Sequence, residues 1–170
     1  MKNYYFLATL LPQLRVGSPP ELSSRELDFL LRQNLSRYDF KQVTTLRELV
    51  DLDNMRAIWQ KMPLKSGGNF DEQELEEILI FKQNLPLYVI EFLDTYKEDE
   101  KRVEQFPMLL RSYFEANTKD RFSFLGKYLL FEWQWRVVFV VLRARKLGRD
   151  VLTELQYENQ EDPFIAEIIA

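Results

Sequence analysis

The sequence predicts an all-α fold, a multi-helix bundle built around a long buried central helix. Glycine is scarce, with 5 residues among 170, whereas a turn-rich all-β protein of this size needs more. Leu, Glu, Lys, Arg and Gln, which favour helices, are abundant. Most segments also combine apolar residues at helical spacing with a capping residue or a helix breaker at their ends.

The first clear helix start lies near Ser24. Ser23 and Glu26 have the spacing of a capping box in front of a leucine-rich segment. The apolar run at 4–11 is too short for periodicity to separate a buried strand from a short buried helix, and we favour the helix.

The next helical segment carries several polar residues suited to helix ends. Asp39 can cap a helix, and Asp53 or Asn54 can restart it further along. Pro63 is expected to end this segment.

Residues 63–70 contain the best candidate boundary inside the chain. Two adjacent glycines in LKSGGN predict a flexible turn. We expect one all-α domain over 1–170, with this turn either joining two helices of that domain or marking where two helical subdomains meet.

The second half contains further helix starts. Asp71 precedes a run of acidic residues, which the helix dipole favours in a first turn, and Pro86 and Pro107 are each suited to open a helix. The longest predicted helix covers about 122–147 and ends at Gly148.

Two short elements follow. Asp150 can cap a turn, and Asp162 followed by Pro163 is a good helix start. The last helix has an apolar face without a polar tail after Ala170, which predicts that the native chain continues beyond residue 170 or that a partner covers this end.

The stretch FEWQWRVVFVVLRARKLGRD, residues 131–150, decides which functions are worth considering. At about 100° per residue, Glu132, Arg136 and Arg143 fall within roughly 40° of one another and form a polar stripe. One flank of the polar stripe holds Trp133, Val137, Val140, Val141 and Ala144, and the other holds Trp135, Phe139 and Leu142. Because most of the circumference is apolar, we expect other helices to surround this helix. The polar stripe is then either a buried lock or the lining of a cleft, and we favour the lock.

The chain contains neither cysteine nor histidine. This composition excludes disulfides, thiolate metal sites, thiol nucleophiles and any arrangement that uses a histidine base. We therefore expect a protein that is not an enzyme, with no catalytic residue, no cofactor-binding residue, no metal ligand and no cofactor.

The net charge of −4 and the pI near 5.1 disfavour attraction to nucleic acid or anionic lipid. The basic cluster at 143–149 is interpreted as a solvated helix end that complements the helix dipole. No segment reaches the roughly 20 apolar residues that a membrane helix needs. The cytoplasm is the expected location, and any membrane association should be peripheral.

Other motifs fail on their spacing. Asp51-x-Asp53-Asn54 resembles the start of a calcium loop, but the sixth position is Arg56 where glycine is required. KSGGN lacks the ending of a phosphate-binding loop. The three tryptophans stand at helical spacing among aliphatic residues, so we expect them in the core. The sequence also contains a short internal similarity, which we call the internal echo. Residues 54–58 and 134–138 both consist of an amide residue, a large apolar residue, an arginine and two apolar residues.

NYYFLATLLPQL at the start, LPLYVIEFLDTYKED in the middle and FEWQWRVVFVVLRARKLGRD near the end resemble, in this order, a bacterial family that accompanies V/A-type ATPases. That family is similar to a shortened form of the C-type subunit of these ATPases, which is also known as the d-type subunit. The most specific part is LRARKLGRD, residues 142–150, preceded by Glu132 and Gln134, where Gln134 takes the place of an asparagine in the pattern of the C-type subunit.

The resemblance implies an elongated bundle like that of the C/d-type subunit, which links the central shaft of a rotary ATPase to its membrane ring of proteolipid subunits. Such a protein transmits motion mechanically and performs no chemistry. A second hypothesis is a free-standing helical adaptor that binds a protein or peptide, and a remote third is a carboxylate-based hydrolase.

Overall fold

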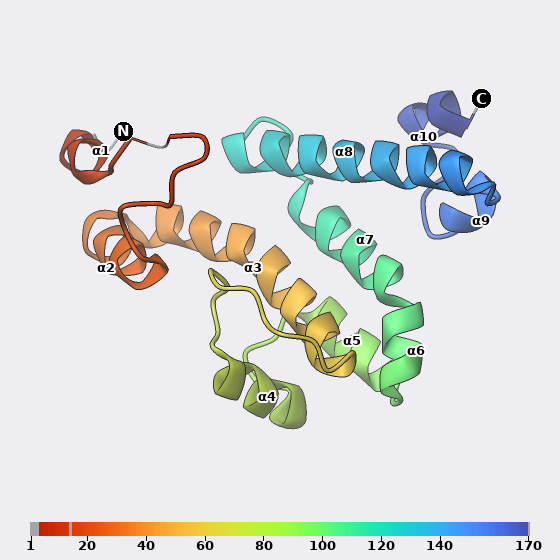
Figure 1. Cartoon of the computed structure of the whole chain (residues 1–170), viewed down its shortest axis with the longest axis horizontal. Helices are drawn as coiled ribbons and strands as arrows, with labels where there is room; N and C mark the ends of the chain where they lie inside the picture. Colours follow the sequence, from red (N-terminus) through yellow and green to blue (C-terminus); the bar gives the residue numbers. More distant parts are fainter. Residues whose placement is uncertain (1–3, 14, 170) are drawn as a thin grey trace.

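The computed structural model describes residues 4–13 and 15–169 and contains ten α-helices and no strand in these ranges, which confirms the predicted all-α multi-helix bundle (Figure 1). In chain order the helices are α1 (Tyr5–Leu10), α2 (Ser24–Asn34), α3 (Arg37–Trp59), α4 (Glu72–Phe81), α5 (Leu87–Thr95), α6 (Asp99–Glu104), α7 (Phe106–Asn117), α8 (Phe124–Leu147), α9 (Val151–Glu154) and α10 (Pro163–Ile169). Within the described part of the chain, no helix combines the length and the apolar character needed to cross a membrane.

Several helix ends lie where the caps and breakers predict them. Ser23 and Glu26 form both hydrogen bonds of a capping box at the start of α2, and Asp71 does the same with Glu74 for α4. At the other end of a helix, Gly148 adopts φ +64 and stops α8. In each case a local interaction satisfies backbone groups that the helix leaves unpaired.

Helix α3 differs from its prediction. It is capped by Ser36, whose hydroxyl accepts from the backbone N–H of Asp39 at 3.1 Å, so the expected cap at Asp39 is wrong. The helix then continues through 53–54 without a restart and ends at Trp59, before Pro63. Asn54 does not cap a helix because its side chain points inward and bonds the loop that follows α3.

One core cluster joins the middle of the chain. Its buried residues are Leu52, Met55, Trp59, Leu75, Val89, Phe92, Leu93, Phe106, Leu109, Tyr113, Phe114 and Leu129. They come from both sides of the glycine-containing turn at 63–70, so this turn connects helices that share a core. The charged segment 97–105 contains the short helix α6.

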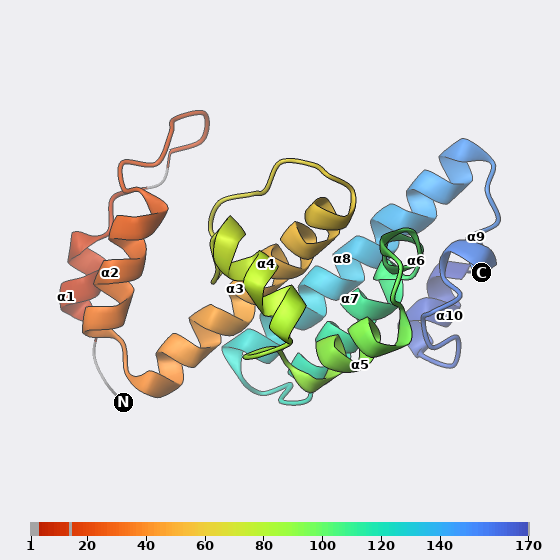
Figure 2. The same ribbon diagram turned by 90° about the horizontal axis from the view of Figure 1, so that it is seen from below.

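A smaller cluster holds the last two helices against α8. It contains Val137, Val141, Leu155 and Ile165, and Trp133 packs against both clusters. Figure 2 shows α9 and α10 beside the C-terminal half of α8. The long helix therefore links the two clusters along its length.

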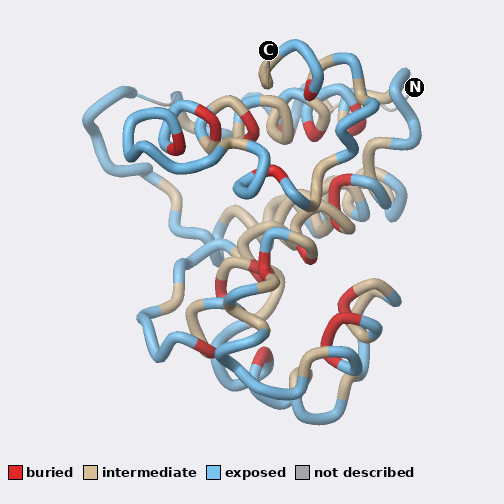
Figure 3. Tube along the Cα trace, turned by 90° about the vertical axis from the view of Figure 1, so that its right-hand side faces the viewer, coloured by how far each residue is buried: buried red, intermediate tan, exposed pale blue. Residues whose placement is uncertain are grey.

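Helix α8 is less enclosed than predicted. Leu129, Val137, Val141 and Ala144 are buried, but Trp135 and other large apolar side chains on the opposite face are exposed. Figure 3 shows buried positions as short segments along the helices, separated by exposed ones. The expectation that neighbours surround α8 on nearly all sides is wrong, because α7, α9 and α10 pack on one side of it.

The helical interpretation of 4–11 is confirmed, but its burial is not. In α1 only Leu7 is buried, whereas Tyr5 and Phe6 are exposed. Helices α1 and α2 lie side by side at one end of the molecule, and α3 leads from them to the rest of the bundle (Figure 2). This arrangement makes the molecule elongated.

Candidate functional site

A cleft of about 350 Å³ lies between α3, α7, α8 and the segment after α9, and it contains two of the three residues of the polar stripe. We name it the arginine cleft, after the lining residues Arg56, Arg111, Arg136 and Arg143. Its apolar lining includes Phe106, Leu110, Val137, Val140 and Leu155.

The turn after α8 leads the chain back to the arginine cleft, where Glu154, Leu155, Tyr157 and Glu158 form one wall. Gly148 ends the helix in the left-handed conformation, and the Asp150 side chain accepts from the backbone N–H of Thr153 at 2.8 Å and so caps α9. Arg149 and Glu154 form an ion pair of 3.2 Å across the turn. The chain reverses here and brings Leu155 against α8.

The structure corrects the preferred interpretation of the polar stripe. Glu132 pairs with Arg136 at 3.0 Å, one helical turn away, and both side chains are partly exposed. Arg143 is exposed and lines the cleft. The predicted buried lock is therefore wrong, because the Arg143 side chain is exposed and Glu132 pairs with Arg136 instead. The alternative, a cleft lining, describes Arg136 and Arg143.

The internal echo in the sequence has a structural counterpart. Arg56 of α3 and Arg136 of α8 occupy equivalent positions in the two similar segments, and both line the same cleft. The guanidinium carbon of Arg56 lies 5.1 Å from the centre of the Phe106 ring, close enough for a cation–π contact.

Arg111 and Glu158 form the more enclosed part of the lining. Arg111 pairs with Glu115 at 2.7 Å, lies 3.9 Å from Glu158, and donates to the carbonyl oxygen of Tyr157. Glu158 also accepts from the indole N–H of Trp133 at 3.1 Å. Burial raises the pKa of the Glu158 carboxyl, while Trp133 and Arg111 lower it in part.

The charges of the arginine cleft are not balanced. Among the described residues, neither Arg56 nor Arg143 has an ion pair, whereas the lining carboxylates Glu104 and Glu154 pair with Lys101 and Arg149. Guanidinium groups bind carboxylates through two parallel hydrogen bonds. The arginine cleft therefore suits a ligand protein that presents an acidic side chain or a C-terminal carboxylate next to an apolar surface.

Sequence reasoning missed Arg56, Arg111 and Glu158 as parts of this site. The echo between 54–58 and 134–138 was the one signal for Arg56. Arg111 and Glu158 carry no signal because only the packing of α7 and the segment after α9 brings them to α8.

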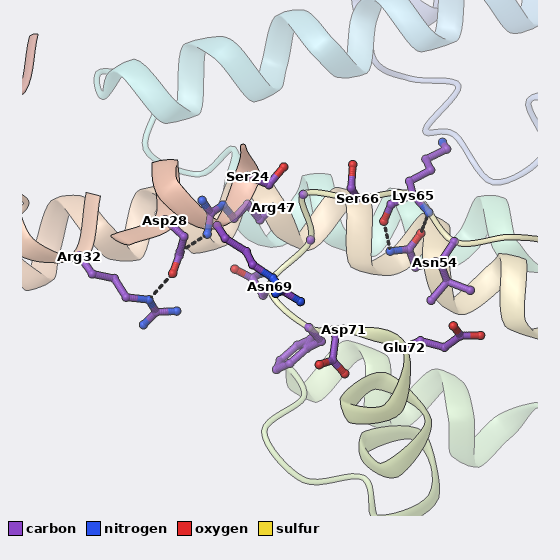
Figure 4. A pocket seen from close by; sticks show the side chains of 15 residues that line it. Ser24, Asp28, Arg32, Arg47, Asn54, Lys65, Ser66, Asn69, Asp71 and Glu72 are labelled. Carbon is purple, nitrogen blue, oxygen red and sulfur yellow. Dashed lines mark hydrogen bonds and ion pairs between the residues drawn. The ribbon is translucent and has the colours of Figure 1, made fainter. Parts of the chain in front are cut away.

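A second hollow, of about 390 Å³, lies beside the glycine-containing turn (Figure 4). The buried Asn54 side chain donates to the carbonyl of Lys65 at 2.9 Å and accepts from its N–H at 2.8 Å. The buried Asp51 carboxylate accepts from the backbone N–H of Asn69 at 2.8 Å and from its side-chain amide at 2.7 Å. These residues fix the turn. They do not form the calcium loop that their spacing resembled.

Two of the three arginines in this second hollow are paired with a carboxylate. Asp28 accepts from Arg32 at 2.6 Å and also pairs with Arg47 (Figure 4). Across the described residues no group of three or more carboxylates is arranged to hold a metal ion. The arginine cleft, with two unpaired guanidinium groups, is the stronger candidate site.

The tryptophans divide between core and surface. Trp59 is buried in the main cluster, and Trp133 packs against both clusters, as predicted. Trp135 is 51% exposed, so the expectation of a core position is wrong for this residue. It lies on the face of α8 opposite the buried one.

The fold and the cleft define an all-helical protein with an arginine-lined groove beside one long helix. Residues 1–170 match the model of a family described as "Protein of unknown function (DUF2764)", and the chain belongs to this family.

Curated relatives occur in three Chlamydia species, and each is described as an uncharacterized protein. The identity is 31% to the protein of Chlamydia pneumoniae, 27% to that of Chlamydia muridarum and 26% to that of Chlamydia trachomatis. Each alignment covers 99% of this chain and 66% of the relative, so the chain spans slightly less than two thirds of their length. No solved structure matches the chain.

Proposed function

We propose that this chain is a non-catalytic coupling component of a V/A-type rotary ATPase, which links the central shaft to the membrane ring of proteolipid subunits. One observation carries the proposal. The stretch that most resembles the C-type subunit, residues 142–150, contributes Arg143 to the lining of the arginine cleft. The same stretch ends α8 and turns the chain at Gly148, which leads residues 154–158 back to the other side of this cleft.

The mechanical demands of such a role agree with the packing of α8. A helix of 24 residues spans about 36 Å at 1.5 Å per residue. Its inner face packs into both core clusters, and a close-packed interior resists bending. The side chains of the arginine cleft suit recognition, because its guanidinium groups can bind carboxylates of another protein in the assembly.

The proposal predicts binding to other parts of the ATPase. The chain should form a complex with the purified central shaft or with the proteolipid ring from the same organism in size-exclusion chromatography and calorimetry. Arg136→Ala combined with Arg143→Ala should weaken this complex at least tenfold, whereas Arg25→Ala, at an exposed position on α2, should leave it unchanged. No complex with either component would overturn the proposal.

The second candidate is a free-standing helical adaptor, favoured by the same cleft and by the exposed apolar face of α8. An adaptor would bind a protein or peptide that has no part in an ATPase. The two candidates separate in the same experiment, because only the coupling component requires the shaft or the ring as its partner.

A further inference from the structure

Helix α8 carries a row of exposed apolar side chains that the arginine cleft does not use. They are Phe124, Tyr128, Phe131, Trp135, Phe139 and Leu142, with exposed fractions from 43% to 78%. Their spacing alternates between three and four residues with one exception, so they form a continuous seam along the helix. We call this row the α8 seam.

The α8 seam is large and internally ordered. Six side chains of roughly 150–250 Å² each, about half exposed, present on the order of 500–700 Å² of apolar surface. This is at or above the upper end for a monomer surface and near the roughly 800 Å² that one partner contributes to a stable interface. Trp135 and Phe139 already pack edge to face, with ring centres 4.4 Å apart. The surface is therefore preformed for contact.

The charges around the α8 seam identify the chemistry of its partner. Helix α8 has five basic residues and one acidic residue, a net charge of +4 in a chain of −4. Lys127 and Arg145 lie beside the seam and Lys146 continues it, and none of the three forms an ion pair among the described residues. The single acidic residue, Glu132, is already paired with Arg136.

We propose that the α8 seam docks an amphipathic helix of another protein, whose apolar residues repeat every three and four positions and whose flanking positions are acidic. The spacing suits knobs-into-holes packing, and the cationic flanks select an acidic helix. A second copy of this chain fits poorly. If the α8 helices of two copies paired antiparallel, Lys127 of one copy would lie near Arg145 and Lys146 of the other. If they paired in parallel, each basic residue would lie near the same residue of the other copy. Both arrangements bring like charges together. The inference does not depend on the ATPase proposal.

The test uses two synthetic helical peptides of four heptads. Both carry leucine at the apolar positions, and the flanking positions are glutamate in one and lysine in the other. Like charges keep each peptide from pairing with itself. In calorimetry with the 170-residue chain, the glutamate peptide should bind at least tenfold more tightly than the lysine peptide. Equal affinities, or no binding of the glutamate peptide, would overturn the proposal.

Two sets of variants locate the contact. Phe131→Ser with Phe139→Ser should weaken binding of the glutamate peptide at least tenfold, whereas Phe81→Ser, a comparably exposed phenylalanine on α4, should leave it unchanged. Lys127→Glu with Lys146→Glu preserves the apolar seam and should reverse the preference toward the lysine peptide. An unchanged preference in this second variant would exclude the α8 seam as the contact.

Two further measurements address other occupants. Sedimentation of the parent should give the mass of one chain at all concentrations used. A doubled mass in the parent, absent in the Phe131→Ser, Phe139→Ser double variant, would show that a second copy occupies the α8 seam. That result would overturn the proposal. The chain should also remain unbound when mixed with phosphatidylglycerol vesicles. Binding to vesicles that the same variant abolishes would identify a lipid surface and overturn the helix partner.

Discussion

Gly68 lies against the buried carboxylate of Asp51, so that a β-carbon at position 68 would come within 2.3 Å of the Asp51 Oδ1 atom. The close approach allows this oxygen to accept from the backbone N–H of Asn69 at 2.8 Å. The two glycines of the turn thus have different roles, since Gly67 adopts φ +96 with open space around it.

Gly68→Ala should destabilise the fold by about 1–3 kcal/mol, because the added methyl group overlaps a buried, hydrogen-bonded oxygen that cannot move freely. Urea unfolding followed by circular dichroism measures the change. Ser66→Ala, at an exposed position of the same turn, is the matched control and should stay within about 0.5 kcal/mol of the parent. Equal midpoints for the two variants would contradict the contact.

The same contact predicts coupling between the two positions. Asp51→Ala alone should be destabilising because it removes the carboxylate that accepts from the backbone N–H and from the side-chain amide of Asn69. In that background Gly68→Ala should cost less than in the parent, since the overlapping oxygen is gone. A double-mutant cycle by urea unfolding measures this difference, and strict additivity would count against the proposed overlap.

The two faces of α8 predict opposite responses to a charge. Val141→Asp places a carboxylate at a position that is 3% exposed and should prevent folding, because the cost of several kcal/mol is a large part of a typical stability. Phe139→Asp, two positions earlier on the exposed face, should leave the helical circular dichroism spectrum unchanged. A folded Val141→Asp variant would contradict the packing of α8 on α10.

The exposed position of Arg143 predicts a small effect on stability. Arg143→Ala should change the free energy of unfolding by less than about 1 kcal/mol, and Arg136→Ala, which breaks a partly exposed pair with Glu132, should do the same. Urea midpoints measure both, with Arg145→Ala as an exposed control. A loss of about 3–5 kcal/mol in Arg143→Ala would instead indicate a buried lock.

The raised pKa of Glu158 predicts a dependence of stability on pH. A carboxyl whose pKa is higher in the folded than in the unfolded state binds more protons in the folded state. The free energy of unfolding therefore increases as the pH falls from neutral toward the ordinary carboxyl pKa of 4.5. Burial raises the pKa values of Glu48 and Asp51 in the same direction. Urea midpoints of the parent should therefore increase from about pH 7 to about pH 5.

Glu158→Gln isolates one of these contributions. Glutamine keeps an oxygen that can accept from the indole N–H of Trp133 but does not titrate, so the increase between about pH 7 and about pH 5 should be smaller than in the parent. Glu104→Gln makes the same charge change at an exposed position and should keep the response of the parent. An identical response in both variants would show that Glu158 is not buried in solution.

Local signals determined most of the helix boundaries. The capping box at Ser23 and the left-handed glycine at position 148 act within a few residues, so the sequence contains everything needed to find them. The uninterrupted course of helix α3 could not be predicted from local signals, because Asp53 and Asn54 are residue types that also cap helices. In the structure Asn54 instead bonds Lys65, eleven positions away in the following loop.

The sequence also determined that Glu132, Arg136 and Arg143 share one side of a helix, since helical periodicity alone fixes their angles. Only the tertiary structure decided which flank of this stripe is covered. Both flanks are apolar and equally suited to burial, but α7, α9 and α10 pack on the flank of Val137 and Val141 and leave that of Trp135 and Phe139 exposed. Helical periodicity predicts which residues share a face of a helix, but it does not predict which of its faces other helices will cover.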